Sequence, residues 1–232
     1  MPRLASLSVP VVLAVLALTA CGGATPDAAG SSAGESPAPT TLVPAAEVRP
    51  DRDELALGPD GMGTLVFGEA PSTDPATAML VLDPDYCLDE NAGLGTGFAP
   101  GSPEAALWVP IPEYRDELFG DFGVLVADGA LGRIDVYNEA IPTTEGVRIG
   151  DRRDDVLAAY PDATVVEEWG TDIFVITGEH GTLQIEVARQ PAEGPYWQDS
   201  EADRVMYLHA VVLGVEPFTV AASENIAGGC PF

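Results

Sequence analysis

The chain has 232 residues, 46% of them apolar, so it is long enough for one domain or two small ones around a packed core. It carries 10 basic and 37 acidic residues, a formal net charge of −27, and every basic residue is an arginine. So acidic a chain repels phosphate backbones and gains nothing from anionic lipid surfaces, which excludes nucleic acid as a partner. A salty habitat could also select for this acidity, which bears on solubility rather than on fold.

Residues 1–20 have the pattern of a secretory signal peptide. Arg3 supplies positive charge near the start, and residues 9–18 form an apolar stretch too short to span a bilayer. The run Leu18-Thr19-Ala20-Cys21 resembles the bacterial lipobox, in which small residues precede the cleavage site and the cysteine thiol receives a diacylglycerol. We therefore expect Cys21 to be the lipidated, palmitate-bearing first residue of a mature protein anchored on the extracytoplasmic face of the cell membrane. The alternative is an ordinary secretory signal in which Cys21 is incidental.

Residues 21–48 are predicted to form a flexible, disordered tether. They are rich in Gly, Ala, Ser, Pro and Thr and lack apolar periodicity. The root-mean-square reach of such a segment is roughly 30 Å, enough to hold a folded body clear of the lipid headgroups. The folded domain is then expected to span residues 49–232.

Cys87 and Cys230 remain once Cys21 takes the lipid. An even number of cysteines in an oxidising compartment predicts a disulfide, which would close nearly the whole domain. The chain-entropy model gives such a loop about 5 kcal/mol of stabilisation. Two separate buried thiols are the alternative. The chain lacks a C-x-x-C motif and paired histidines, so we expect neither a metal site nor a cofactor.

Two helices are predicted, each after a short apolar segment bounded by glycines. The first spans residues 74–82 and ends before Pro84. The second spans residues 151–160, with Asp151 as its N-cap and Pro161 as its end. The apolar face of the second helix is expected to consist of Val156, Leu157 and Tyr160.

Strands are predicted between and after these helices. Alternating residues and turn signals predict two hairpins and one further strand. The predicted strands are residues 122–127 and 133–137, residues 172–177 and 182–188, and residues 205–214. We therefore predict an α+β fold, in which helices cover one face of an antiparallel sheet.

The opposite face of this sheet is expected to meet solvent. Alternation assigns Leu183, Ile185 and Val187, the set Met206, Leu208, Ala210 and Val212, and the pair Ile134 and Val136 to the covered face. Gln184, Glu186 and Asp135 then point outward. Aromatic and guanidinium groups are enriched in interface hot spots, so outward-facing members become candidates for a partner-binding surface together with one loop. These candidates are Arg133, Tyr137, Tyr207, His209 and the loop residues Tyr196 and Trp197.

Short glycine-based motifs carry a resemblance to a known family. They are Gly61-Met62-Gly63 through Gly68, Thr144-Glu145-Gly146-Val147-Arg148-Ile149-Gly150-Asp151 with the adjoining helix to Tyr160-Pro161, and the closing Gly228-Gly229-Cys230. Over about 170 residues the chain resembles lipoproteins of actinobacteria with tandem helix-on-sheet repeats, similar to the β-lactamase inhibitory protein and the small lipoprotein of the barrel-assembly machine. The resemblance implies half-repeats at residues 58–140 and 141–232 and a non-enzymatic role. It carries over no inhibitory site, because no interface residue can be matched.

The signatures of catalysis are weak. The chain has no G-x-S-x-G motif, and neither His180 nor His209 has a recognisable nucleophile near it in sequence. Residues 83–91 are rich in carboxylates but fit a calcium loop poorly, because Cys87 falls at a ligand position. Trp108 and Trp169 are expected to pack in the core or at a sheet edge.

The expected function is that of a non-catalytic, surface-anchored lipoprotein that binds an extracytoplasmic protein or envelope component. The fold resemblance offers an alternative, an inhibitor of an extracytoplasmic enzyme. An envelope hydrolase is the third possibility and would require a pocket lined by paired carboxylates.

Overall fold

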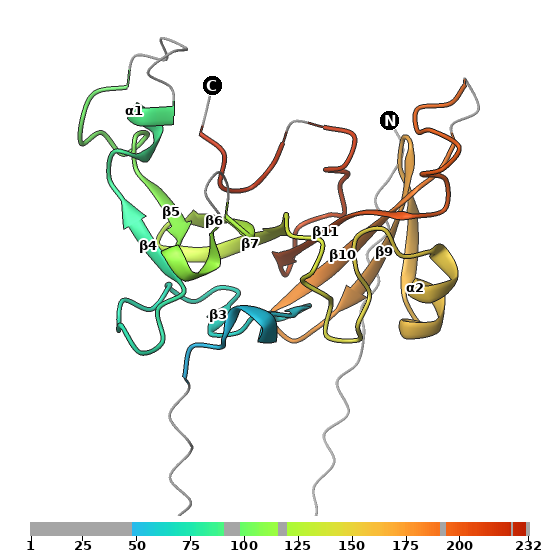
Figure 1. The fold of residues 1–232 in the computed structure, drawn as a ribbon, viewed down its shortest axis with the longest axis horizontal. Helices are drawn as coiled ribbons and strands as arrows, with labels where there is room; N and C mark the ends of the chain where they lie inside the picture. Colours follow the sequence, from blue (N-terminus) through green and yellow to red (C-terminus); the bar gives the residue numbers. More distant parts are fainter. Residues whose placement is uncertain (1–47, 91–97, 116–119, 191–193, 224, 231–232) are drawn as a thin grey trace, which may run out of the picture. The chain divides into compact units, whose positions relative to one another are not determined.

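The computed structural model describes residues 48–90, 98–115, 120–190, 194–223 and 225–230 (Figure 1). These residues belong to one compact unit that runs from Ala45 to Phe232. The predicted signal peptide, Cys21 and the tether up to residue 47 lie outside the described residues. Among the helices of the described residues, none has the length and apolarity needed to cross a membrane.

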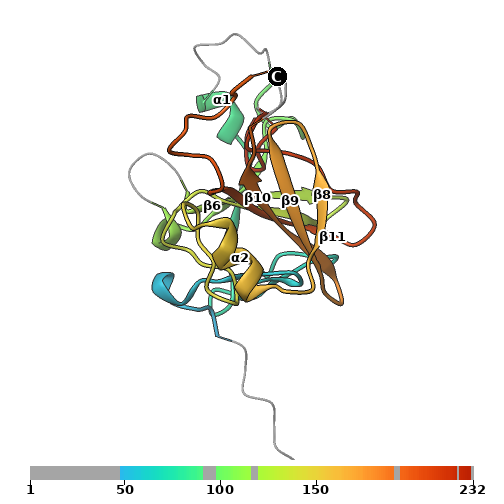
Figure 2. The ribbon, with the colours of Figure 1, turned by 90° about the vertical axis from the view of Figure 1, so that its right-hand side faces the viewer.

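A six-stranded antiparallel sheet forms the centre of this unit. Its strand order is β6-β7-β11-β10-β9-β8. The strands are β6 (Phe122–Ala127), β7 (Ala130–Val136), β8 (Thr164–Glu167), β9 (Thr171–Thr177), β10 (Gly181–Ala188) and β11 (Val205–Val212). Figure 2 shows β8, β9 and β10 side by side. Both predicted hairpins and the last predicted strand are confirmed.

The hairpin of β6 and β7 turns where the sequence predicts. Asp128 and Gly129 connect the strands and both have positive φ, 53° and 81°. Two consecutive residues with positive φ are typical of the tight hairpin turn that Asp-Gly favours. The local sequence therefore specifies this turn, although β7 begins at Ala130 rather than at Arg133.

Smaller elements precede and flank the large sheet. They are the 3-10 helices η1 (Arg52–Glu54) and η2 (Pro112–Tyr114), the three-stranded sheet of β1 (Leu57–Gly58), β2 (Gly61–Met62) and β3 (Leu65–Val66), the pair β4 (Leu80–Asp83) and β5 (Leu107–Pro110), and the helices α1 (Tyr86–Glu90) and α2 (Arg153–Ala159). The described residues thus form mostly antiparallel sheets with few helices, an arrangement consistent with α+β or mainly β architecture.

The predicted helix over residues 74–82 is wrong. Asp74 closes a single turn, in which its carbonyl accepts the amide of Ala78 at 2.7 Å. The chain then extends into β4, where Leu80 pairs with Pro110 and Leu82 with Trp108. The residues around Asp74 therefore form one helical turn, as their sequence favours. The structure of residues 80–83 is determined by pairing with β5, almost thirty positions further along the chain.

Helix α2 forms close to its predicted position but begins two residues later. The Asp151 carboxylate accepts the amide of Arg148 at 2.7 Å instead of capping the helix, and Asp155 accepts the amide of Arg152 at 3.0 Å. Val156 is fully buried, whereas Leu157 is 46% exposed. The prediction that Leu157 packs inward is wrong, since it lies about 100° around the helix from Val156.

One face of the large sheet packs into the apolar core. Most predicted inward residues belong to the main buried cluster, namely Ile134, Val136, Leu183, Ile185, Val187, Leu208 and Ala210. Val212 is partly buried against this cluster, whereas Met206 is partly buried outside it, because the β-bulge between Glu186 and Val187 places Val205, 1% exposed, opposite Val187. The same cluster contains Leu57, Met62, Leu65 and Phe67 from the N-terminal strands and the segment after them, and Val156 and Tyr160 from the region of α2. The buried cluster therefore includes side chains of the N-terminal segment as well as two from the region of α2.

Candidate functional site

The face predicted to meet solvent is buried. Alternation correctly groups its side chains: His209 lies opposite Gln184 on β10 and Asp135 on β7, and Tyr207 lies opposite Glu186. Their exposure was predicted wrongly, because Asp135, Gln184, Glu186 and His209 are 0% exposed and Arg133 is 5% exposed. The covering element is the segment after β11, residues 214–223 and 225–230, which we call the C-terminal strap (Figure 1, red).

Acceptor side chains of the sheet hold the backbone of the C-terminal strap. Glu186 Oε1 accepts the amide of Val220 at 2.6 Å, and both Glu186 oxygens lie 3.2 Å from the amide of Ala221. Asp135 Oδ2 accepts the amide of Ala227 at 2.7 Å. Charge-assisted hydrogen bonds of this kind satisfy carboxylates that would otherwise be buried at high cost.

His209 lies at the centre of this polar face. The Gln184 Oε1 atom accepts the amide of Phe218 at 3.2 Å, so the His209 Nε2 atom 3.0 Å away must be the donor to it. The other ring nitrogen, Nδ1, lies 3.5 Å from Glu186 Oε1 without hydrogen-bond geometry. Burial and, to a smaller extent, the positive charge of Arg133 together lower the pKa of His209 to about 3. The ring is therefore neutral at pH 7.

The predicted aromatic members of this face are only partly accessible. The Tyr137 hydroxyl donates to the Ala227 carbonyl, and the Tyr207 hydroxyl donates to Asp135 Oδ2 at 3.2 Å. Burial raises the pKa of both phenols well above the ordinary value of 10. Arg133 forms a bidentate pair with Asp135 and lies 4.9 Å above the ring centre of Phe218. Tyr137 and Arg133 thus contact the strap and Tyr207 contacts Asp135, so these side chains are largely occupied within the domain.

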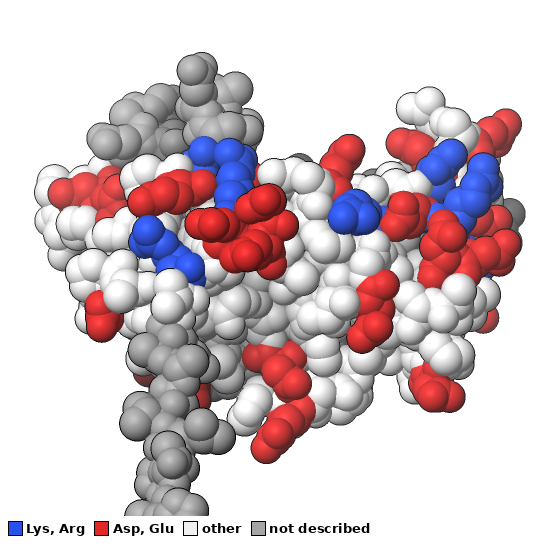
Figure 3. All heavy atoms as spheres, turned by 60° about the horizontal axis from the view of Figure 1, so that its bottom comes forward, with Lys and Arg blue, Asp and Glu red and all other residues white. Residues whose placement is uncertain are grey.

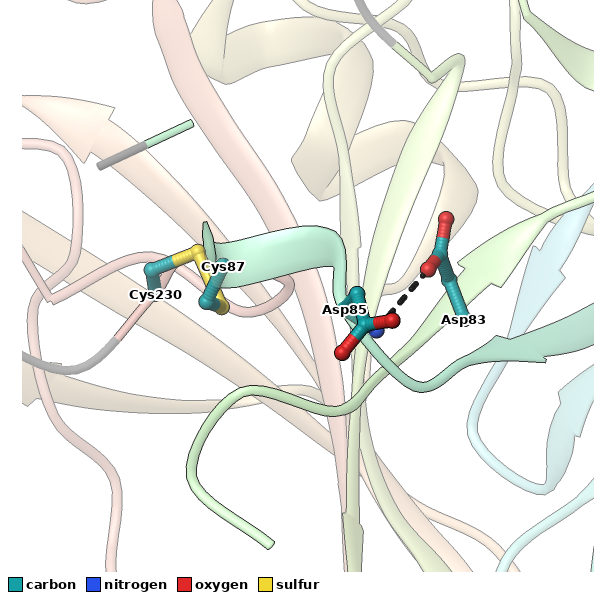
Figure 4. Close-up of a disulfide and its surroundings, with 4 residues drawn as sticks. All are labelled: Asp83, Asp85, Cys87 and Cys230. Carbon is teal, nitrogen blue, oxygen red and sulfur yellow. Dashed lines mark hydrogen bonds between the residues drawn. A yellow bond between two sulfur atoms is a disulfide. The ribbon is translucent and has the colours of Figure 1, made fainter. Parts of the chain in front are cut away.

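The predicted cysteine pair is confirmed at disulfide distance. The Cα atoms of Cys87 and Cys230 lie 5.5 Å apart and their sulfur atoms are joined (Figure 4). Cys87 lies on α1 and is 0% exposed, whereas Cys230 lies near the end of the strap. The bond therefore attaches the strap to an element outside the large sheet.

An exposed group of aromatic rings lies elsewhere, at the turn between β8 and β9. Trp169 is 55% exposed and Tyr196 is 45% exposed, and their ring centres lie 4.6 Å apart in a T-shaped contact. Trp197 makes a second such contact with Tyr196, also at 4.6 Å, and its Nε1 donates to the Gly170 carbonyl at 2.5 Å. We call Trp169, Tyr196 and Trp197 the aromatic patch.

The sequence identified part of this patch. The loop position made Tyr196 and Trp197 candidates for exposed aromatics, with packing as the favoured alternative. Tyr196 is 45% exposed and Trp197 is partly buried. Trp169 was expected to pack in the core or at a sheet edge. It is 55% exposed and so does not lie in the core, but it lies at the turn after the edge strand β8, where its ring contacts Tyr196. The sequence predicts a strand just after Trp169 and Gly170 but none before them, so the hairpin of β8 and β9 that places Trp169 at its exposed tip was not predicted.

The surroundings of the aromatic patch are acidic, and the arginines there are paired. Arg189 contacts Glu167 at 2.9 Å and Asp172 at 3.2 Å, and its Nη2 donates to the Glu168 carbonyl. Arg153 contacts Asp172 at 2.8 Å and Asp203 at 2.9 Å. On the face drawn in Figure 3, acidic side chains are widely spread, while the basic ones lie beside acidic groups.

Two hollows of the described surface contain titratable side chains. A groove of about 490 Å³ is lined by residues that include Glu145, Tyr160 and Asp162, but no histidine lines it. His180 lines a separate hollow, where its backbone amide donates to Asp60 at 2.6 Å. Within the described residues, no three His, Cys, Asp or Glu side chains gather as metal ligands.

Comparisons with known proteins give no family. No protein-family model and no curated protein sequence matches the chain. Among solved structures, the chain is similar to the crystal structure of the uncharacterized protein yfeY from Escherichia coli. That match has 17% sequence identity and a TM-score of 0.38, and it covers 68% of this chain and 99% of the other. A likeness this weak does not establish a shared fold or function.

Proposed function

We propose that this protein is a non-catalytic lipoprotein of the extracytoplasmic membrane face that binds a protein partner through its aromatic patch. The lipobox before Cys21 supports the anchor and the location. The joined Cys87 and Cys230 support an oxidising compartment. The predicted tandem repeats and the likeness to inhibitory lipoproteins remain hypotheses, in which the partner would be an enzyme.

The single observation that carries this proposal is the exposure of the aromatic patch. Trp169 and Tyr196 keep roughly half of their surface in water although they already contact each other. Large aromatic side chains lose little conformational entropy on binding and dominate the energetics of interfaces. The hydrogen bond from Trp197 to Gly170 fixes the patch in place before any partner arrives.

The charge of the chain favours a basic partner. The net charge is −27, and Arg189, which donates to the Glu168 carbonyl beside Trp169, is already paired with Glu167 and Asp172. A partner surface with Arg or Lys side chains would be steered to this protein and would place cations over the exposed rings. Because such steering is screened, association should slow as the salt concentration rises.

A fluorescence titration tests the patch with defined probes. A peptide that alternates Arg and Gly should quench the tryptophan emission of the wild-type domain, and a matched Glu and Gly peptide should not. The double substitution Trp169→Ala and Tyr196→Ala should abolish the response. Leu213→Ala is the matched control, because Leu213 is 46% exposed on another part of the domain. Equal binding by the double variant and the control would contradict the proposal.

A further inference from the structure

The C-terminal strap lies on the polar face of the sheet in the manner of a bound peptide. The sheet recognises mainly its backbone: Gln184, Glu186 and Asp135 accept amides of Phe218, Val220, Ala221 and Ala227. In return, Arg133 donates to the Asn225 carbonyl at 2.8 Å, and Tyr137 donates to the Ala227 carbonyl. Contacts to backbone amides and carbonyls are what a receptor for extended peptides uses.

This interface is more polar than a protein core. Of the strap side chains, Val220 is 1% exposed and Ala227 is 4% exposed, while Phe218 and Thr219 are only partly buried. The sheet side of the interface consists of Arg133, Asp135, Gln184, Glu186 and His209, which water would solvate well. Release of the strap would therefore return hydration to charged groups and expose few apolar atoms.

The disulfide adds a covalent restraint to this polar contact. Cys230 comes after the last backbone contacts of the strap, and its partner Cys87 belongs to α1 rather than to the large sheet. With both ends attached, the strap stays at high effective concentration over the polar face. With the disulfide broken, only its connection to β11 holds it there covalently.

We propose that the polar face of the large sheet is a binding site for an extended peptide segment, which the chain's own C-terminal strap occupies and vacates when the Cys87–Cys230 disulfide is reduced. This site is distinct from the aromatic patch and does not depend on the function proposed for it.

The opening step is a thiol–disulfide exchange with a dithiol reductant. A thiolate of the dithiol attacks one sulfur of the pair, and the bond between Cys87 and Cys230 breaks as a mixed disulfide forms. The second thiol of the reductant then displaces that cysteine. Two electrons pass from the dithiol, which becomes a disulfide, and Cys87 and Cys230 each end as a protonated thiol.

The shape of the site restricts which segments fit. A Cβ atom added to Gly123 on β6 would collide with the carbonyl of Ala227 and with the Tyr137 hydroxyl, so the strap backbone passes directly over this glycine. The strap carries Ala227 and Gly228 at this crossing. A ligand therefore needs small residues there and a small apolar residue at the position of Val220.

Hydrogen exchange of the full mature chain tests the release of the strap. We compare the oxidised protein, the protein reduced by dithiothreitol, and the double variant Cys87→Ser and Cys230→Ser. The amides of Val220, Ala221 and Ala227 should lose protection about tenfold or more in the last two, while those of β10 and β11 keep theirs. Unchanged strap protection overturns the proposal, and so does equal loss from strap and sheet, which would make the disulfide a global brace.

A labelled peptide tests the binding site itself. The probe is a fluorescent peptide with the sequence of residues 214–229, which ends before Cys230. Its anisotropy should rise with the reduced protein or the double Cys→Ser variant and stay unchanged with the oxidised protein. In the Cys→Ser background, Gly123→Ala should block binding. Gly132→Ala is the control, because a Cβ there lies 3.6 Å from its nearest neighbour, an ordinary contact. A released strap without peptide binding, or binding that Gly123→Ala leaves intact, overturns the proposal.

Discussion

Glu186 is a buried carboxylate whose hydrogen bonds hold the strap on the sheet. Its oxygens accept the Thr219 hydroxyl at 2.5 Å and the amides of Val220 and Ala221. Burial raises the pKa of its carboxyl, while these hydrogen bonds lower it. The substitution Glu186→Gln replaces one acceptor by a donor that faces amides, so it should lower the free energy of unfolding by about 1–3 kcal/mol in urea titrations.

Glu167→Gln is the control for this substitution. Glu167 contacts Arg189 at 2.9 Å, but its side chain is 75% exposed. Exposed ion pairs contribute about 0–1 kcal/mol. If the two variants lost equal stability, the strap contacts of Glu186 would not be the reason for its effect.

The pH dependence of stability should report on His209. Its folded pKa of about 3 lies below the ordinary 6.5, so its contribution is present above pH 6.5 and is lost as the pH falls towards 3. Relative to His209→Gln, the wild type should lose up to about 1.4 kcal/mol per pH unit between about pH 6 and about pH 4. Glu186, Asp135 and Arg133, the ionisable groups around the ring, are common to both proteins. Urea midpoints measured at each pH check this, and parallel curves for the two proteins would contradict it.

Helix α2 allows a direct comparison of two neighbouring side chains, one buried and one exposed. Val156 is fully buried in the core, and Leu157 is 46% exposed. Val156→Ala should cost about 1–3 kcal/mol, through lost burial and the cavity left behind, whereas Leu157→Ala should cost less than about 1 kcal/mol. Thermal or urea unfolding measures both, and the reverse order would mean that the helix packs through its other side.

The elements that sequence alone predicted are those whose signals are local. Asp128 and Gly129 specify their hairpin, and the alternation around Gln184 and Glu186 correctly separates the two faces of β10. Alternation cannot tell which segment covers a polar face. Here the cover is a strap that lacks apolar periodicity and lies some thirty residues further along the chain, so polar side chains that indicated solvent meet backbone amides instead.

The difference between local and long-range signals also explains which aromatic residues were assigned correctly from the sequence. Tyr196 was identified because its loop context is local. Trp169 was assigned to packing because tryptophan usually packs, and the hairpin that exposes it was not predicted. Tyr137 and Tyr207, the predicted anchors, are bound to the strap and to Asp135. The candidate binding surface in the structure is therefore the tip of a hairpin at the edge of the sheet, and not the middle of the sheet as the sequence predicted.

The proposed lipid anchor at Cys21 can be tested independently of the fold of the domain. Cys21→Ser should abolish metabolic labelling with palmitate and prevent removal of the expected signal peptide, because our proposal makes this thiol the group that receives the lipid. Gel mobility and labelling of the two proteins in their own host measure both effects. Labelling that persists in the variant would show that Cys21 is incidental.

Photo-cross-linking in intact cells tests the central claim, binding through the aromatic patch, most directly. A photoreactive phenylalanine derivative replaces Trp169 in one strain and Leu213 in another, both exposed positions in the described part of the domain. Our account predicts that irradiation joins the first protein to one discrete extracytoplasmic partner with a basic surface, and that raised salt weakens this product. It predicts no such product at Leu213. Identical products at both positions, or none at Trp169, would contradict the account.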